Sequence, residues 1–194
     1  MDKAVKGVAP KVRPPLIVFL DRDGVICRYF ANDFTKSWEE FEFLSGAREA
    51  LKLLNQAEAR VIIISNQSGV NKGIYSAKEL KKIDRRMTEA VTASGGRIDA
   101  SFYCPHIPVE SCLCRKPGTG LVTKAVSELH LNLKKSAAYF VGDSETDIIT
   151  GHRAGLITIL VLSGQTVLAK ETEGWTIKPD HIAPDLMGAL KYIL

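Results

Sequence analysis

The amino-acid sequence predicts an α/β fold, a three-layer Rossmann-like parallel sheet with helices on both faces. Short apolar runs recur along the chain, and segments with a helical spacing of apolar residues separate them. Apolar runs of about five residues are typical of parallel strands that are buried on both sides. Strands that alternate with helices favour right-handed crossovers, which place helices on both faces of one sheet.

The expected elements follow from these patterns. Leu16–Leu20 is a short, partly β-branched run, and Ser76 followed by Glu79 predicts a helix that starts with a capping box. Strands are expected over residues 16–20, 61–64, 101–103, 138–141 and 157–161, and near residue 181. Helices are expected over residues 47–54, 76–91, 120–130 and 145–154, and from Pro184 or Asp185 onward, since proline suits a first helical turn.

Length and composition indicate one ordinary compact domain. The chain has 194 residues, 45% of them hydrophobic and 25% charged, which is enough to bury a core without disulfides. With 15 Gly and 8 Pro, collagen-like and low-complexity classes are excluded. No apolar run approaches the roughly 18 residues that a membrane span needs. We expect a flexible tail over residues 1–14, a single domain over residues 15–194, and no membrane partner.

The charge balance gives little support for a nucleic-acid partner. Lys and Arg number 26 against 22 Asp and Glu, and residues 1–14 carry +3 of the net +4. A nucleic-acid surface needs basic residues gathered on a folded face. The tail also lacks the apolar stretch of a signal peptide. We therefore expect a cytoplasmic monomer that binds no nucleic acid.

Polar or charged side chains follow four of the expected strands. They are Asp21 and Asp23 after the first, Ser65 after the second, Lys116 after the third, and Asp143 and Asp147 after the fourth. Each has a structural explanation by itself, such as helix capping for the last two acids. Ligands bind at the carboxyl ends of strands in such sheets, so we expect these side chains around one crevice. Carboxylates suit Mg²⁺, and the set predicts Mg²⁺-assisted phosphoryl transfer through a carboxylate nucleophile.

A cysteine-rich segment lies between the third strand and Lys116. Its pattern is C-x-H-x5-C-x-C, formed by Cys104, His106, Cys112 and Cys114. Four such ligands with no open position are typical of tetrahedral structural zinc. We expect a zinc loop over residues 104–114 that holds Arg115 and Lys116 in place. Cys27 lies outside the cluster and is expected to be a small buried side chain.

The chain resembles the haloacid dehalogenase (HAD) superfamily of phosphatases over residues 16 to about 162. The resemblance rests on four motifs in order, namely D-x-D-G-V at Asp21, S-N at Ser65, R-K-P at Arg115 and G-D-x-x-x-D at Gly142. Only 41 residues separate Asp23 from Ser65, and 50 separate Ser65 from Lys116. A HAD-like fold without a large cap domain is therefore expected.

The resemblance implies a role for each motif residue. As catalytic residues it implies Asp21 as nucleophile, Asp23 as general acid and base, Ser65 as a hydrogen-bond partner of the phosphoryl group, and Lys116 as the neutralising cation. It implies Mg²⁺ on Asp21, on the backbone carbonyl of Asp23 and on Asp143, with Asp147 a further acid near the metal or the partner of Lys116. Asn66 and Arg115 are expected to bind substrate.

The zinc loop narrows the resemblance to two groups of small phosphatases. These act on D-glycero-D-manno-heptose 1,7-bisphosphate and on histidinol phosphate. Ser65–Val70 and Arg115 resemble the heptose group, whereas a histidinol site needs an acid for the substrate ammonium, and Glu110 is the only candidate in the zinc loop. We expect the heptose bisphosphate first and histidinol phosphate second, with loops 27–45 and 104–115 selecting the substrate.

Two other functional classes remain as alternatives. A nucleic-acid end phosphatase is suggested by the basic residues over 78–86, although a solvated helix face explains them more simply. A catalytically silent, zinc-bearing binding module is also possible on this fold, since fold does not determine function. Every expected catalytic position is filled, which favours an enzyme.

Overall fold

The computed structural model describes residues 14–194, and its centre is a six-stranded sheet in the order β3-β2-β1-β4-β5-β6. All neighbouring strands are parallel. The strands are β1 (Leu16–Leu20), β2 (Arg60–Asn66), β3 (Ala100–Cys104), β4 (Ala137–Gly142), β5 (Ile157–Val161) and β6 (His181–Ala183). Apart from Pro14, the predicted tail over residues 1–14 lies outside the described residues. Within residues 14–194 there is no helix whose length and hydropathy would let it cross a membrane.

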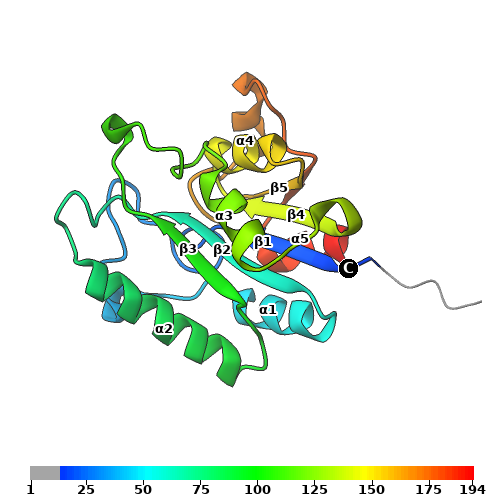
Figure 1. Ribbon diagram of the computed structural model, residues 1–194, viewed down its shortest axis with the longest axis horizontal. Helices are drawn as coiled ribbons and strands as arrows, with labels where there is room; N and C mark the ends of the chain where they lie inside the picture. The colour runs from blue at the N-terminus through cyan, green and yellow to red at the C-terminus, as the bar shows by residue number, and fades with distance from the viewer. Residues whose placement is uncertain (1–13) are drawn as a thin grey trace, which may run out of the picture.

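Helices cover both faces of the sheet, which confirms the predicted three layers (Figure 1). One face carries α1 (Ala47–Gln56), α2 (Ala77–Ala93) and α5 (Leu186–Ile193), and the other carries α3 (Gly120–Glu128) and α4 (Glu145–Arg153). Short 3-10 helices lie in the connections: η1 (Trp38–Glu40), η2 (Pro108–Glu110), η3 (Leu133–Lys135) and η4 (Ala169–Gly174).

The continuous apolar runs are explained by burial on both faces. Along β1, Val18 and Leu20 pack into the core under α1, while Ile17 and Phe19 pack into the core under α3. All four are at most 2% exposed. A strand covered on one face only would show apolar and polar residues in alternation. The site-bearing ends of the strands are therefore held from both sides.

Two boundaries and one capping interaction differ from those expected. β2 extends to Asn66, so that Ser65 lies within the strand rather than after it. Pro184 precedes helix α5, because Asp185 is the N-cap and accepts a hydrogen bond from the Gly188 N–H at 2.7 Å. Ser76 caps α2 as predicted, but the Glu79 carboxylate pairs with Lys82 at 3.1 Å, which leaves the capping box half formed.

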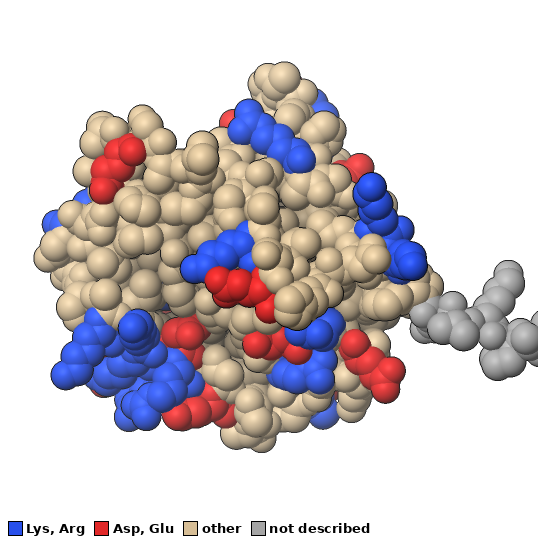
Figure 2. Space-filling model, in the orientation of Figure 1, with Lys and Arg blue, Asp and Glu red and all other residues tan. Residues whose placement is uncertain are grey.

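The basic residues of α2 lie on its exposed side, where Figure 2 shows Lys and Arg gathered at the lower left with acidic residues beside them. Three of these cations have acidic partners. They form the pairs Lys82–Glu79, Arg86–Glu39 and Arg85–Glu89, at 3.1, 3.8 and 3.9 Å. This mixture of charges agrees with the simpler interpretation, in which the basic residues form a solvated face of the helix. The monomeric state and the lack of a nucleic-acid partner stay predictions.

Truncation of Leu54 tests how far α1 contributes to stability. This side chain is fully buried in the core between α1 and the sheet, so Leu54→Ala should lower the free energy of unfolding by about 2–5 kcal/mol. The exposed Val167, at 58%, provides the control, because Val167→Ala should change it by less than about 0.5 kcal/mol. Urea denaturation measures both, and equal stability of the two variants would contradict the packing described.

Candidate active site

The predicted crevice exists at the carboxyl ends of the strands. A cavity of about 390 Å³ opens there between the strand ends and residues 29–35 of the first long loop. Its lining includes six of the predicted site residues: Asp21, Asp23, Ser65, Asn66, Arg115 and Asp143. Lys116 and Asp147 lie buried beside them. Residues from three strand ends and from the zinc loop thus share one site.

Asp21 lies at the tip of the central strand, in the position predicted for a nucleophile. Its Oδ1 accepts a hydrogen bond from the Arg22 N–H at 2.7 Å, and its Oδ2 lies 2.8 Å from the Lys116 ammonium. Burial raises the pKa of Asp21 to about 6, and the charge of Lys116 only partly opposes this shift. A second cation at Asp21 would therefore be favoured electrostatically.

Lys116 is a buried cation, 3% exposed, that is held by three acceptors. Its Nζ lies 2.8 Å from Asp21 Oδ2 and 2.6 Å from Asp147 Oδ1, and it donates to the Ile64 carbonyl at 3.0 Å. Burial alone would lower the pKa of Lys116, but Asp147 and Asp21 outweigh it and raise the pKa above its ordinary value. Since an ammonium has three donors, the side chain is fully engaged and its charge is permanent.

The acids of the G-D-x-x-x-D motif differ in what they contact. Asp147 has both oxygens engaged, Oδ1 with Lys116 and Oδ2 with the Ser144 N–H and hydroxyl at 3.1 and 2.6 Å. The Asp143 carboxylate accepts only from the Gln165 N–H, at 2.6 Å, among the hydrogen bonds of the described residues. Asp147 therefore combines the two roles expected for it, helix capping and orientation of Lys116, while Asp143 keeps an oxygen free.

The donor set around Asp21 and Asp143 fits Mg²⁺. Carboxylate oxygens of Asp21, Asp143 and Asp147 lie within 4.8 Å of one another, and burial raises the pKa of Asp143 as Asp147 and Asp21 raise it further. Hard oxygen ligands with surplus negative charge are what this ion prefers. Gly24 and Gly164 leave room for Asp143, because a Cβ on either would fall about 2 Å from its Oδ2.

The predicted substrate-binding residues are tied to the loop that carries Lys116. Asn66 uses both ends of its amide on the Lys116 backbone, at 3.0 and 3.2 Å, so it also fixes the loop. Arg115 donates from Nη1 to the His106 carbonyl at 3.1 Å and lines the cavity. Ser65 is 1% exposed, and its hydroxyl accepts a hydrogen bond from Gln67 at 3.1 Å.

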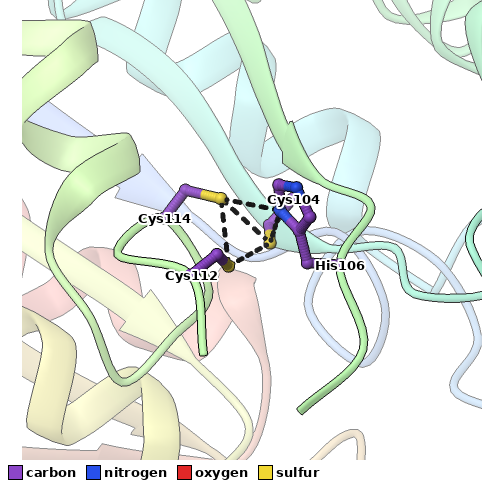
Figure 3. Close-up of side chains that lie close together, drawn as sticks. All are labelled: Cys104, His106, Cys112 and Cys114. Carbon is purple, nitrogen blue, oxygen red and sulfur yellow. Dashed lines mark hydrogen bonds between the residues drawn. The ribbon is translucent and has the colours of Figure 1, made fainter. Parts of the chain in front are cut away.

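The four predicted zinc ligands converge, as Figure 3 shows. The distances between their sulfur atoms are 3.2–3.6 Å, and His106 Nδ1 lies 3.5 and 3.2 Å from the sulfurs of Cys104 and Cys114. A tetrahedral zinc with bonds of 2.3 Å to sulfur places its sulfurs about 3.8 Å apart. The cluster is therefore compatible with zinc. Cys27 is buried as expected, although its thiol also lies 3.3 Å from Asp23 Oδ1.

Several residues around the site were missed by the sequence analysis. Arg22 and Gln67 are fully buried and contact the Asp23 carboxylate, and Lys72 lines the cavity. Arg22 and Gln67 stand inside the D-x-D and S-N-Q-S-G segments that were singled out. Arg22 stands between two acids expected at the site, and that was the signal that could have found it, because such groups are rarely buried without a partner. Gln67 has no acid beside it in the sequence and gave no such signal.

Comparison with known proteins identifies the family. The family model described as HAD-hydrolase-like matches residues 113–189. The D-glycero-D-manno-heptose-1,7-bisphosphate 7-phosphatase of Chlorobaculum tepidum is 33% identical over 92% of this chain and 94% of its own length. The D-glycero-alpha-D-manno-heptose-1,7-bisphosphate 7-phosphatase of Mycobacterium tuberculosis is 36% identical over 75% of this chain and 76% of its own.

A solved structure agrees with the sequence comparisons. The D,D-heptose 1,7-bisphosphate phosphatase of B. bronchiseptica, complexed with magnesium and phosphate, superimposes with a TM-score of 0.82 at 31% identity. The match covers 91% of this chain and 97% of that one. Sequence and structure thus agree over nearly the whole length of both proteins. This chain belongs to the HAD-like phosphatases, in the family that includes the heptose-1,7-bisphosphate 7-phosphatases.

Proposed function

We propose that this protein is a Mg²⁺-dependent phosphatase that removes the C7 phosphate of D-glycero-D-manno-heptose 1,7-bisphosphate. The observation that carries the proposal is the convergence of Asp21, Asp143 and Lys116 at the base of one cavity. The names of its relatives support the substrate.

The reaction has two steps, and Asp23 transfers one proton in each of them. Asp21 attacks phosphorus, the bond from phosphorus to the C7 oxygen breaks, and the Asp23 carboxyl gives its proton to the departing alkoxide. Asp23, now a carboxylate, takes a proton from water, and the resulting hydroxide attacks the aspartyl phosphate. Phosphate leaves, and both aspartates return to their starting forms.

Several groups of the chain stabilise the negative charge of the phosphoryl group in the transition state. Lys116 neutralises Asp21 next to the incoming phosphoryl group, and Ser65 and backbone amides bind its oxygens. A Mg²⁺ ion held by Asp21, Asp143 and the backbone carbonyl of Asp23 would supply Lewis-acid stabilisation of the phosphoryl oxygens.

The second phosphate of the substrate explains the cations at the rim of the cavity. Arg115 and Lys72 both line the cavity, on the loops that follow the neighbouring strands β3 and β2, and a guanidinium can bind a phosphate in a bidentate manner. Glu110, which a histidinol site would need for the substrate ammonium, instead accepts from the Asn71 amide at 2.9 Å and lies outside the cavity lining. Glu110 is therefore not placed to bind the ammonium of histidinol phosphate, which supports the bisphosphate as the preferred substrate.

Zinc has a structural role in this proposal. The four ligands Cys104, His106, Cys112 and Cys114 would close its coordination shell, which leaves no position for a reacting water. The His106 carbonyl holds Arg115. The ion would thereby position a substrate-binding side chain.

A direct assay separates the two substrates. Purified enzyme with Mg²⁺ should hydrolyse heptose 1,7-bisphosphate with a kcat/KM at least about 100-fold above that for histidinol phosphate, because only the bisphosphate engages both Arg115 and Lys72. Released phosphate is measured for both anomers, since the relatives include enzymes named for each. A larger kcat/KM for histidinol phosphate would contradict the assignment.

Removal of the nucleophile should stop the reaction. Asp21→Asn should lower kcat by more than about 10³-fold, because an amide cannot form the aspartyl phosphate. Circular dichroism and zinc content should stay near those of the unsubstituted protein, since the zinc loop is a separate cluster. Retained turnover in a correctly folded variant would remove Asp21 from this role.

Loss of one zinc ligand should lower stability. Cys112→Ser should reduce bound zinc and lower Tm by more than about 4 °C, because metal binding energy contributes to the folded state. Leu113→Ser is the matched control, as this side chain lies between two ligands and is 87% exposed. Metal analysis and thermal melting measure both. A Cys112→Ser variant with full zinc content would argue against the site.

Mg²⁺ affinity should rise with pH. Because the pKa of Asp21 is raised to about 6, most of this carboxyl is protonated at pH 5 and ionised at pH 7, and the ion competes with the proton. Affinity without substrate should therefore increase at least about tenfold between these pH values. Titration calorimetry measures it, and an unchanged Kd would show that Asp21 does not bind the ion.

A further inference from the structure

The Asp23 carboxylate lies in a cradle of donors that none of the proposed steps uses. Arg22 donates from Nε and Nη2 to Oδ1 at 3.2 and 3.0 Å, and from Nη2 to Oδ2 at 3.0 Å. Gln67 Nε2 donates to Oδ2 at 2.6 Å. Arg22 and Gln67 are both 0% exposed, whereas the Asp23 side chain is 24% exposed and lines the cavity. One edge of the carboxyl is thus fixed by hydrogen bonds from two buried side chains.

The orientation of the Gln67 amide is determined by its neighbours. Its Oε1 accepts from Arg22 Nη2 at 3.0 Å and from the Tyr75 hydroxyl at 2.5 Å. Its Nε2 donates to Asp23 and to the Ser65 hydroxyl at 3.1 Å. A guanidinium can only donate, so the amide oxygen must face Arg22 and the NH2 group must face Asp23. All four hydrogen-bonding positions of the amide are filled.

Tyr75 links this amide to the loop that lines the cavity. Its ring packs against Phe34, with centroids 6.1 Å apart, and Phe34 is a lining residue. Gly69 allows the approach, because a Cβ there would fall 2.2 Å from the Tyr75 ring and 3.1 Å from Phe34. Tyr75 is 8% exposed, and it joins Gln67 through its hydroxyl to a residue of the cavity lining through its ring.

From these contacts we infer that Gln67, oriented by Arg22 and Tyr75, is the positioning residue that aims the Asp23 carboxyl at the leaving-group oxygen. The inference rests on the proposed role of Asp23 as general acid. Without Gln67, Oδ2 keeps only the hydrogen bond from Arg22 Nη2, while Oδ1 keeps those from Arg22 and from the Cys27 thiol. The carboxyl is then held less firmly, and the O–H samples directions in which no proton transfer occurs.

Proton transfer depends on such alignment. Among the described residues no hydrogen bond joins this amide to the Asp21 nucleophile, and its bond to the Ser65 hydroxyl would affect phosphoryl binding equally for every leaving group.

Leaving groups of different basicity test the inference. An alkoxide needs a proton to leave, whereas p-nitrophenolate leaves without one. Gln67→Met keeps the length of the side chain and removes all four hydrogen bonds. Its kcat/KM should fall about 10- to 100-fold on heptose 1,7-bisphosphate and less than about 3-fold on p-nitrophenyl phosphate. The ratio kcat/KM reports the first phosphoryl transfer only, so hydrolysis of the aspartyl phosphate does not obscure the result.

A milder variant keeps the test decisive if Gln67→Met folds poorly. Tyr75→Phe removes one hydroxyl and leaves the contact with Phe34. It should lower kcat/KM about 3-fold or more on the sugar phosphate and leave p-nitrophenyl phosphate unchanged. Tyr192→Phe is the matched control, because that hydroxyl donates to the Ile182 carbonyl at the far edge of the sheet. Equal losses on both substrates would indicate a merely structural role and overturn the inference.

Asp23→Asn separates this inference from the function on which it rests. It should show the same selective loss on the sugar phosphate, at larger size, because the acid itself is gone. If Asp23→Asn loses both substrates equally, the proposed role of Asp23 fails. If Asp23→Asn is selective and the variants of Gln67 and Tyr75 are not, the positioning role alone fails.

Discussion

The site depends on one buried cation, Lys116, which lies between Asp21 and Asp147. Two buried carboxylates would repel each other and any phosphate dianion, and a lone buried ammonium would be costly. Together the three charges are stable, and their geometry follows from elements that meet only in the folded chain. β1 brings Asp21, α4 brings Asp147, and the loop after β3 brings the lysine. The chemistry is therefore assembled by the sheet topology.

Most of the fold was predictable from local pattern. The run Leu16–Leu20 and the spacing of Ala47, Ala50, Leu51 and Leu54 give β1 and α1 at nearly the observed positions, because burial imposes these patterns on the residues. Boundaries were less accurate where polar residues continue an element. β2 runs on to Asn66 because parallel pairing with β3 extends to its last residues, and pairing with a distant strand leaves no local signal.

The candidate site also contains residues that the sequence predicts and residues that it does not. Residues with distinctive chemistry, such as Asp21, Lys116 and the zinc cluster, are visible in the sequence and converge in the structure. The side chains that contact the Asp23 carboxylate were missed. Gln67 and Arg22 resemble ordinary polar residues until the fold buries them against Asp23. Their importance comes from desolvation, which a one-dimensional pattern does not contain.

The distribution of the site over rigid and irregular segments has a consequence for how this architecture diversifies. Asp21 directly follows the central strand β1, which pairs with β2 on one side and β4 on the other, while residues 29–35 and Arg115 lie on connections. Changes in the connections leave the central strands untouched. Substitutions in these two loops can thus change which substrate an enzyme with this fold prefers, while the residues that break the phosphate ester bond stay the same.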